Sequence, residues 1–257
     1  MRITIRRVLA VAAAAALALT ASACAPSGTG GTGGGGNSDF LRVGTTSPVD
    51  SLNPFVADSD YSSVLFQYSY PHLTEYDQDL KIVPSFAQKW ETSADGKTWT
   101  FHTVPDAKWS DGEPLTAEDV AFTANMIKQF SDGPTGILAG WVAHLDKAEA
   151  TDPNTVVFNY EAPVANVLTQ VQALHILPKH IWEPLAQGDG GEITSFQNAA
   201  PIVSGGPFKL DKYEKDQLMM FSVNKNWYGE KPKITGFGFQ FFANDDAMVS
   251  ALKSGQV

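Results

Sequence analysis

The sequence predicts a mixed α/β fold. Short segments of strand character are interspersed irregularly with segments of helical periodicity, and they follow no internal repeat. Of the 257 residues, 43% are hydrophobic and 18% are charged, a composition that excludes disorder along the whole chain. A chain of this length buries roughly 70% of its unfolded surface, so it needs neither a disulfide nor a metal to stabilise a core.

Strand signals lie in three single segments and two hairpins. In the segment nearest the C-terminus, Phe237, Phe239 and Phe241 alternate with other residues, so we expect these rings on one side of a strand. Asp95-Gly96 supplies a turn for the first hairpin. The expected single strands span residues 41–45, 155–160 and 234–242, and the expected hairpins span 89–102 and 208–223.

Three helices are indicated by their boundaries and periodicity. Thr116 is a typical N-cap residue, and Asp119 follows three residues later, as in a capping box. A shorter helix is expected over residues 62–69. The last helix is expected to begin after a cap at Asn244 or Asp245.

The N-terminus has the pattern of an export signal. Basic residues precede an unbroken apolar run of 12 residues from Val8 to Leu19, which is too short to span a bilayer but matches the core of a signal peptide. Small residues then precede Cys24, the single Cys, in an arrangement that resembles the bacterial lipobox. We predict a lipoprotein signal peptide over residues 1–23 and lipidation at Cys24. An ordinary signal peptide is the alternative, and Arg6-Arg7 leaves twin-arginine export open beside the general secretory route.

A Gly-rich tether is predicted over residues 24–38. Within it, Gly31 to Gly36 matches the dinucleotide pattern G-x-G-x-x-G, but that pattern has meaning only between a strand and a helix, so we assign it no function. One diacylated Cys carries two chains, which suffices for stable anchoring. The N-terminal region therefore predicts a domain held at the outer face of a bacterial membrane.

Charge and motif content argue against nucleic-acid binding and against catalysis. The chain has 28 acidic and 18 basic residues, a formal net charge of −10, and no basic footprint for nucleic acid. Its five His residues form no H-E-x-x-H zinc motif. Ser222 and Lys225 match S-x-x-K, but the accompanying S-D-N and K-T-G elements are absent. We predict that the chain is not an enzyme and has no cofactor and no metal site.

One segment of the sequence matches a known pattern. Residues 109–120, WSDGEPLTAEDV, join an Asp-Gly turn, a Pro and a capped helix. This segment resembles the signature of the family 5 extracellular solute-binding proteins of ABC transporters, the oligopeptide, dipeptide and nickel-binding type. Further segments resemble the same family in the same order: SLNP at 51–54, IVPSFA at 82–87, TWTF at 98–101, ILPKH at 176–180, SGGPF at 204–208, NWYG at 226–229 and ALKSG at 251–255.

The resemblance implies a periplasmic-binding-protein type II-like lobe with an extra α+β subdomain. By this analogy residues 39–60 and 200–257 form the first lobe, and residues 61–199 form the extra subdomain. Family members have two lobes around a ligand cleft. We expect the second lobe to follow Val257, so we interpret the chain as part of a longer protein.

The implied function is capture of a peptide or a similar small solute outside the membrane and its delivery to the permease subunits of an ABC importer. We expect a lipid-anchored monomer that binds no nucleic acid. The family's ligand-contacting loop corresponds to the residues after Pro54, and a second candidate is the turn before Phe208. The candidate ligand-binding residues are Asp58, Ser59, Asp60, Tyr61, Ser204, Gly205, Gly206 and Pro207.

Two other classes of function stay open at this point. One is an extracellular hydrolase whose catalytic site lies in the part beyond Val257. The other is an adhesive or structural lipoprotein, for which a Gly-rich tether is equally suitable. The sequence leaves the ligand open among a peptide, a nickel complex, an oligosaccharide and an opine.

Overall fold

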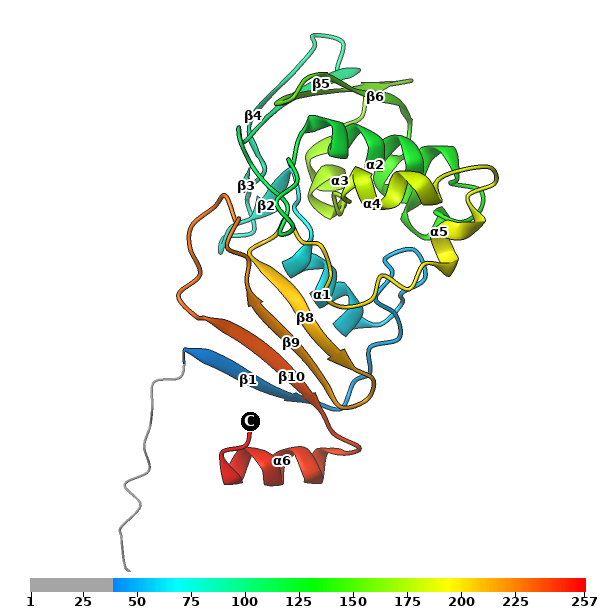
Figure 1. The fold of residues 1–257 in the computed structure, drawn as a ribbon. Helices are drawn as coiled ribbons and strands as arrows, with labels where there is room; N and C mark the ends of the chain where they lie inside the picture. The colour runs from blue at the N-terminus through cyan, green and yellow to red at the C-terminus, as the bar shows by residue number, and fades with distance from the viewer. Residues whose placement is uncertain (1–38) are drawn as a thin grey trace, which may run out of the picture. The chain divides into compact units, whose positions relative to one another are not determined.

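The computed structural model describes residues 39–257 (Figure 1). The predicted signal peptide, Cys24 and the predicted tether lie outside the described residues. Between Asp39 and Val257 the chain forms two four-stranded sheets, one two-stranded sheet and helices packed against them. The mixed α/β prediction is confirmed.

The first sheet is built from the two ends of the described chain. Its strands are β1 (Phe40–Thr45), β8 (Phe208–Glu214), β9 (Leu218–Val223) and β10 (Gly236–Phe241), in the order β1-β10-β9-β8. β1 pairs in parallel with β10, and the other pairs are antiparallel. Strand β1 therefore lies beside a strand that comes almost 200 residues later, as the blue β1 and the orange-red β10 in Figure 1 show.

The second large sheet has the order β4-β5-β7-β6 and is antiparallel throughout. Its strands are β4 (Ala87–Thr92), β5 (Thr98–Thr103), β6 (Leu145–Asp152) and β7 (Thr155–Tyr160). Helix α2 (Ala117–Gln129) packs on β6 and β7 and buries its apolar side there. A small sheet pairs β2 (Thr74–Tyr76) with β3 (Ile82–Pro84).

The remaining helices are short. Helix α1 (Asp60–Ser69) packs on β8, and α6 (Asp245–Ser254) packs on β1. The others are α3 (Val167–Ala173), α4 (Lys179–Trp182), α5 (Gly191–Ser195) and the 3₁₀ helices η1 (Gly136–Val142) and η2 (Glu183–Leu185).

Most predicted boundaries are confirmed within one or two residues. The capping box at Thr116 forms, with Asp119 accepting from the Thr116 amide at 2.8 Å. Asn244, rather than Asp245, caps α6, because its side chain accepts from the Ala247 amide at 2.9 Å. Both predicted hairpins form, as β4–β5 and β8–β9.

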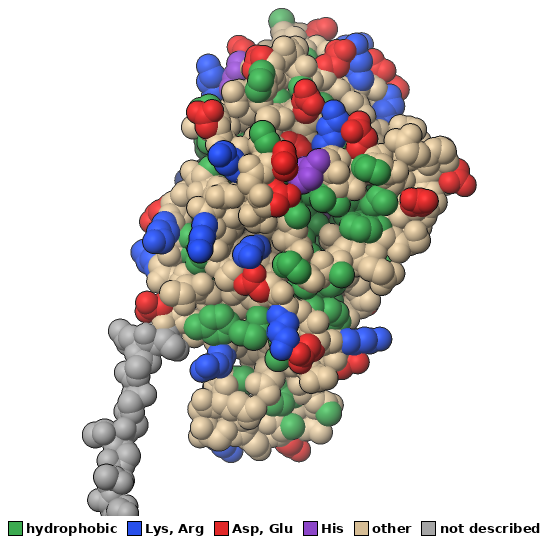
Figure 2. Space-filling view, in the orientation of Figure 1, with side chains coloured by type: hydrophobic (Ala, Val, Ile, Leu, Met, Phe, Trp, Pro, Cys, Tyr) green, Lys and Arg blue, Asp and Glu red, His purple; other side chains and the backbone are tan. Residues whose placement is uncertain are grey.

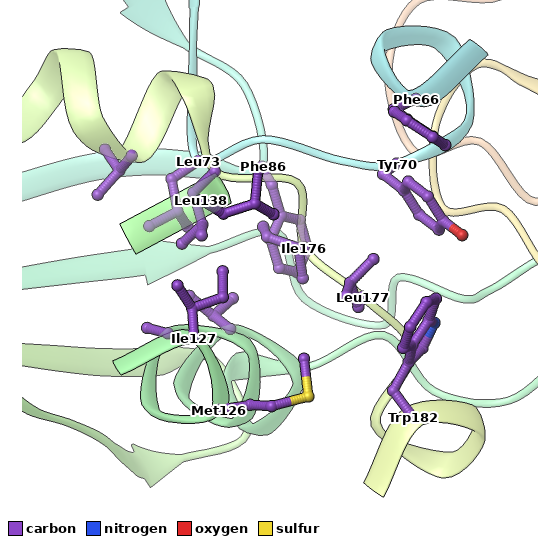
Figure 3. Close-up of a cluster of buried hydrophobic side chains, with 14 of the residues drawn as sticks. Phe66, Tyr70, Leu73, Phe86, Met126, Ile127, Leu138, Ile176, Leu177 and Trp182 are labelled. Carbon is purple, nitrogen blue, oxygen red and sulfur yellow. The ribbon is translucent and has the colours of Figure 1, made fainter. Parts of the chain in front are cut away.

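A continuous apolar core connects helices and sheets. Figure 3 shows Phe66 and Tyr70 from α1 and the residue after it, with Met126 and Ile127 from α2 and Trp182 from α4 around the same cluster. Tyr70 and Trp182 are almost completely buried. Burial of large side chains of this kind is the main stabilising contribution in a domain of this size, at about 1.5–3 kcal/mol each.

The signature segment has a structural role that explains its residues. Asp119 is buried, and its two carboxylate oxygens accept from the amides of Thr116 at 2.8 Å and Lys179 at 2.9 Å. Burial raises the pKa of Asp119, and these hydrogen bonds oppose that rise. Nearby, His180 Nε2 lies 2.9 Å from Asp111 Oδ2. Two segments that resemble the family, residues 109–120 and 176–180, are thus joined to each other.

The predicted division into a first lobe and an extra subdomain stays a prediction. The first sheet uses residues 40–45 and 208–241, and the second uses residues 87–160. The predicted extra subdomain begins at Tyr61 and so includes nearly all of helix α1, which packs on β8 of the first sheet.

Candidate ligand-binding site

The loop between β1 and α1 is organised by one carboxylate, that of Asp50. Its oxygens accept hydrogen bonds from the amides of Ser51 at 2.9 Å and Asp58 at 2.7 Å, and from Ser62 Oγ at 2.7 Å. Partial burial favours the neutral acid, but the hydrogen bonds from Ser62, Asp58 and Ser59 outweigh it and lower the pKa of Asp50 to about 2. The ionised carboxylate therefore closes this loop onto the first turn of α1.

Two buried Asn side chains fasten the same loop to the α5 region. Asn53 Nδ2 donates to the carbonyls of Ile193 at 2.7 Å and Phe196 at 2.8 Å, while its Oδ1 accepts from the Phe55 amide at 2.9 Å. From the other side, Asn198 Nδ2 donates to the Leu52 carbonyl at 2.7 Å. Because buried backbone carbonyls need partners, these amides fix the position of the loop.

The first four candidate residues lie where this loop enters α1. Ser59 is the N-cap, and its Oγ accepts from the Ser62 amide at 3.2 Å. Asp58 and Asp60 are exposed, and Asp60 lies in the first turn, where the helix dipole stabilises a carboxylate. Tyr61 is half-buried, with its ring edge-on to Phe239 of β10 at 5.0 Å. The loop therefore presents two carboxylates and one aromatic side chain on a fixed backbone.

The second candidate segment, residues 204–207, is mostly internal. Ser204 is fully buried, and its Oγ lies 2.5 Å from the Ser69 carbonyl and 2.6 Å from the Phe208 carbonyl. Asn224 Nδ2 donates to the carbonyls of Ser204 at 3.2 Å and Gly206 at 2.9 Å. Only Pro207 of this segment is half-buried rather than buried.

Both glycines in that turn are required by close approach rather than by an unusual φ. A Cβ on Gly206 would lie 2.3 Å from the Tyr68 carbonyl oxygen, and a Cβ on Gly205 would lie 2.9 Å from the Trp109 ring. Residues 204–207 therefore contact both the last turn of α1 and the signature segment, residues 109–120. This packing gives Ser204, Gly205 and Gly206 a structural role.

The two candidate segments lie at opposite ends of α1. Helix α1 has 10 residues, so its ends are about 15 Å apart. Along its exposed side, Ser63, Gln67 and Tyr68 lie between them. Tyr68 also packs edge-on against Phe208 and Phe237 at 6.0 and 5.1 Å. A ligand that touched both segments would lie along this side of α1.

Four residues that organise the site were not among the predicted ones: Asp50, Asn53, Asn198 and Asn224. Asp50 precedes the turn at residues 51–54 and Asn53 lies within it, and Asp and Asn at such positions commonly bond to nearby backbone amides. That signal was present in the sequence. The side-chain NH₂ groups of Asn198 and Asn224 donate to backbone carbonyls at least 18 residues away in the sequence, which no local pattern indicates.

Residues 39–257 contain no group of three or more His, Cys, Asp or Glu side chains placed to hold a metal ion. Over the same residues, the helices are all too short or too polar to cross a bilayer.

Comparison with known proteins identifies the family. Residues 81–257 match the family described as bacterial extracellular solute-binding proteins, family 5 Middle. The chain belongs to this family. Family 5 solute-binding proteins are transport components without enzymatic activity.

Relatives and structural neighbours agree with this family 5 assignment. A protein of Brucella ovis, named as an ABC transporter peptide-binding protein, is 31% identical over 209 residues, which cover 80% of this chain and 38% of the relative. The oligopeptide-binding protein AppA of Bacillus subtilis, solved with a nonapeptide, superposes with a TM-score of 0.76 at 22% identity, covering 85% of this chain and 43% of AppA. NikZ of Campylobacter jejuni, solved with Ni(L-His), gives a TM-score of 0.74 at 21% identity, covering 86% and 42%.

The chain thus spans less than half the length of these family 5 proteins. The predicted membership of family 5 is confirmed, and the type of fold agrees with the neighbours. What the neighbours bind is a property of those proteins.

Proposed function

We propose that this family 5 chain is the solute-binding component of an ABC importer, with a peptide or a similar small solute as its ligand. The observation that carries the proposal is the family match over residues 81–257, together with relatives named for peptide binding. The loop from Asp50 to Tyr61 supports it, because its exposed groups are held on a backbone that several hydrogen bonds fix in place. A preorganised surface loses little entropy when it binds a ligand.

The mechanism is capture without covalent chemistry. In a two-lobed binding protein, the solute favours the closed state in proportion to the contacts that it makes with both lobes. The exposed carboxylates of Asp58 and Asp60 would pair with cationic groups of the solute, such as a peptide amino group or a Lys side chain. The half-buried Tyr61 would contribute apolar and hydrogen-bonding contacts.

The proposal also includes export of the protein and its anchoring to the membrane by a lipid. Cys24 would carry the lipid, residues 25–38 would form the tether, and the protein would act as a monomer at the outer face of the membrane. The partners would be the permease subunits of the importer. The turn at residues 204–207 would support the site through its packing on α1, with Pro207 as its accessible residue.

Mass spectrometry of small molecules that co-purify with the full-length protein tests the function. Peptides or a similar solute are expected, retained by the wild type and depleted in the variant Asp58→Asn/Asp60→Asn. The matched control is Asp77→Asn/Asp79→Asn, which removes two carboxylates from the turn between β2 and β3 and should retain the solute. Absence of any solute from the wild type contradicts the proposed function. Equal retention by both variants contradicts the roles of Asp58 and Asp60.

A further inference from the structure

A lysine-lined groove of about 840 Å³ lies between β8, the end of β9 and the segment that connects β9 to β10. Four Lys residues line it, together with the hydroxyl-bearing Ser110 and Ser222 and two acidic residues. The Lys residues are Lys209, Lys225, Lys231 and Lys233, and the acidic residues are Asp39 and Asp211. Ser222 and Lys225, which match S-x-x-K in the sequence, therefore both face this groove.

Most of the positive charge in the groove is uncompensated by ion pairs. Lys209 Nζ lies 2.8 Å from Asp211 Oδ1. Lys225, Lys231 and Lys233 are exposed and form no ion pair with any residue between Asp39 and Val257. In a chain with 28 acidic and 18 basic residues, such a group is a local exception. Ammonium groups that share one concave surface repel one another, and an anion between them relieves that repulsion.

The groove lies where the chain enters the described domain. Asp39 lines the groove, and its carbonyl accepts from the Thr235 amide at 2.7 Å. If Cys24 carries a lipid, residues 25–38 are the only link between the anchor and Asp39. If these 14 residues form the predicted tether, a Gly-rich chain of that length would have a root-mean-square length of about 20 Å. An anchored protein would therefore hold this groove close to the membrane surface at a high effective concentration.

We propose that the groove binds the phosphate headgroups of an anionic membrane surface and so orients the anchored protein. This proposal rests on the lipid anchoring included in the proposed function. Lysine ammonium groups bind phosphate as point charges, which suits headgroups that present no fixed geometry. On the visible side in Figure 2, acidic and basic side chains are interspersed.

Lysine footprinting of the full-length protein in vesicles tests this inference. The protein is reconstituted in vesicles of phosphatidylcholine with or without phosphatidylglycerol and treated with an uncharged amine-reactive ester, and the labelling rate of each Lys is read by mass spectrometry. Phosphatidylglycerol should slow labelling of the groove residues several-fold, and high salt should restore it. The internal controls are the exposed Lys81, Lys89 and Lys97, whose rates should not change.

Charge-matched variants separate the groove from general electrostatics. In Lys225→Glu/Lys231→Glu/Lys233→Glu, Lys209 should lose its protection by phosphatidylglycerol. In the control Lys81→Glu/Lys89→Glu/Lys97→Glu, which changes the net charge by the same amount, Lys209 should stay protected. Equal loss in both variants overturns the proposal, as does equal labelling in the two kinds of vesicle.

One further comparison distinguishes a soluble anion from a membrane surface as the ligand of the groove. Without vesicles, inorganic phosphate is compared with chloride at equal ionic strength. Protection by phosphate that matches protection by phosphatidylglycerol vesicles overturns a membrane-facing role. Solute retention in the co-purification experiment does not depend on the groove, so a negative footprint leaves the solute-binding function standing.

Discussion

The half-buried pair His72 and His175 predicts a loss of stability in mild acid. His72 Nε2 lies 2.8 Å from His175 Nδ1, so one ring donates a hydrogen and the other accepts it. The rings of Trp141 and Phe66 pack on His175 with centroid distances of 5.1 and 5.7 Å. Between Asp39 and Val257, no acidic side chain forms an ion pair with either His, so a protonated imidazole would lack a counter-ion there. Burial lowers the pKa of His72 to about 4, and burial together with the charge of His72 lowers the pKa of His175 well below 6.5.

The size of the effect follows from the pKa of His72. An unfolded His titrates near 6.5 and the folded His72 near 4, so the unfolded state binds the proton first as the pH falls. The contribution of the neutral pair is fully present above pH 6.5 and is lost as the pH falls from 6.5 to 4. For His72 alone the loss amounts to about 3 kcal/mol at pH 4. His175 changes stability in the same direction.

Urea unfolding at pH 7.5, 5.5 and 4.0 measures this loss. The variant His72→Leu should lose less stability than the wild type over that range, by about 3 kcal/mol. The control is His144→Asn, at an exposed residue with φ of 62°, a conformation that Asn tolerates. Its pH dependence should equal that of the wild type. A His72→Leu variant with an unchanged pH dependence would refute the assigned role of the pair.

Four further outcomes are expected. Asn53→Ala should lower the free energy of unfolding by about 2–4 kcal/mol in urea titrations, because it removes the side-chain donor from one buried and one part-buried carbonyl. Gly206→Ala should destabilise by at least about 2 kcal/mol, since its Cβ meets the Tyr68 carbonyl, whereas Gly140→Ala, with nothing within 4 Å, should be near neutral. Cys24→Ser should move the protein from the membrane fraction to the soluble fraction; a variant that stays membrane-bound with unchanged mass would contradict lipidation. Peptidase, esterase and β-lactam hydrolysis assays should be negative, and a saturable activity that disappears in Ser222→Ala would contradict the non-enzymatic prediction.

Local features of the fold were predictable because their causes are local. The capping box of Thr116 and Asp119 needs only two side chains three residues apart. The turn of the β8–β9 hairpin closes through a hydrogen bond from the Gln217 amide to the Glu214 carbonyl at 3.0 Å. Patterns of this kind are complete within a few residues, so the sequence alone contains them.

Long-range pairing was not predictable from such patterns. The parallel pairing of β1 with β10 joins segments almost 200 residues apart, and no short pattern in either segment indicates that it pairs with the other. The same holds for the pair of His72 and His175, which are 103 residues apart. The spacing of the His residues along the chain gives no sign of this pair, because proximity in the fold has no signature in spacing.

The candidate site shows the same limit. Family resemblance indicated the turns at residues 58–61 and 204–207, and local rules for caps explain why Ser59 begins α1. Burial of Ser204, Gly205 and Gly206 follows from packing against Ser69, Tyr68 and Trp109, which the sequence does not show. The ligand contacts of both turns stay predictions.

Helix α1 connects the two candidate segments, and it is held in place at both of its ends. At its N-terminus, Asp50 and Asn53 fix the loop that carries the exposed carboxylates. At its C-terminus, the Ser69 carbonyl accepts from the amides of Gly205 at 3.0 Å and Gly206 at 2.9 Å. A helix held at both ends transmits little of the motion of its surroundings to the groups that it carries. For the proposed solute-binding surface this rigidity would be an advantage, because each rotamer or loop that must be ordered on binding subtracts from the affinity.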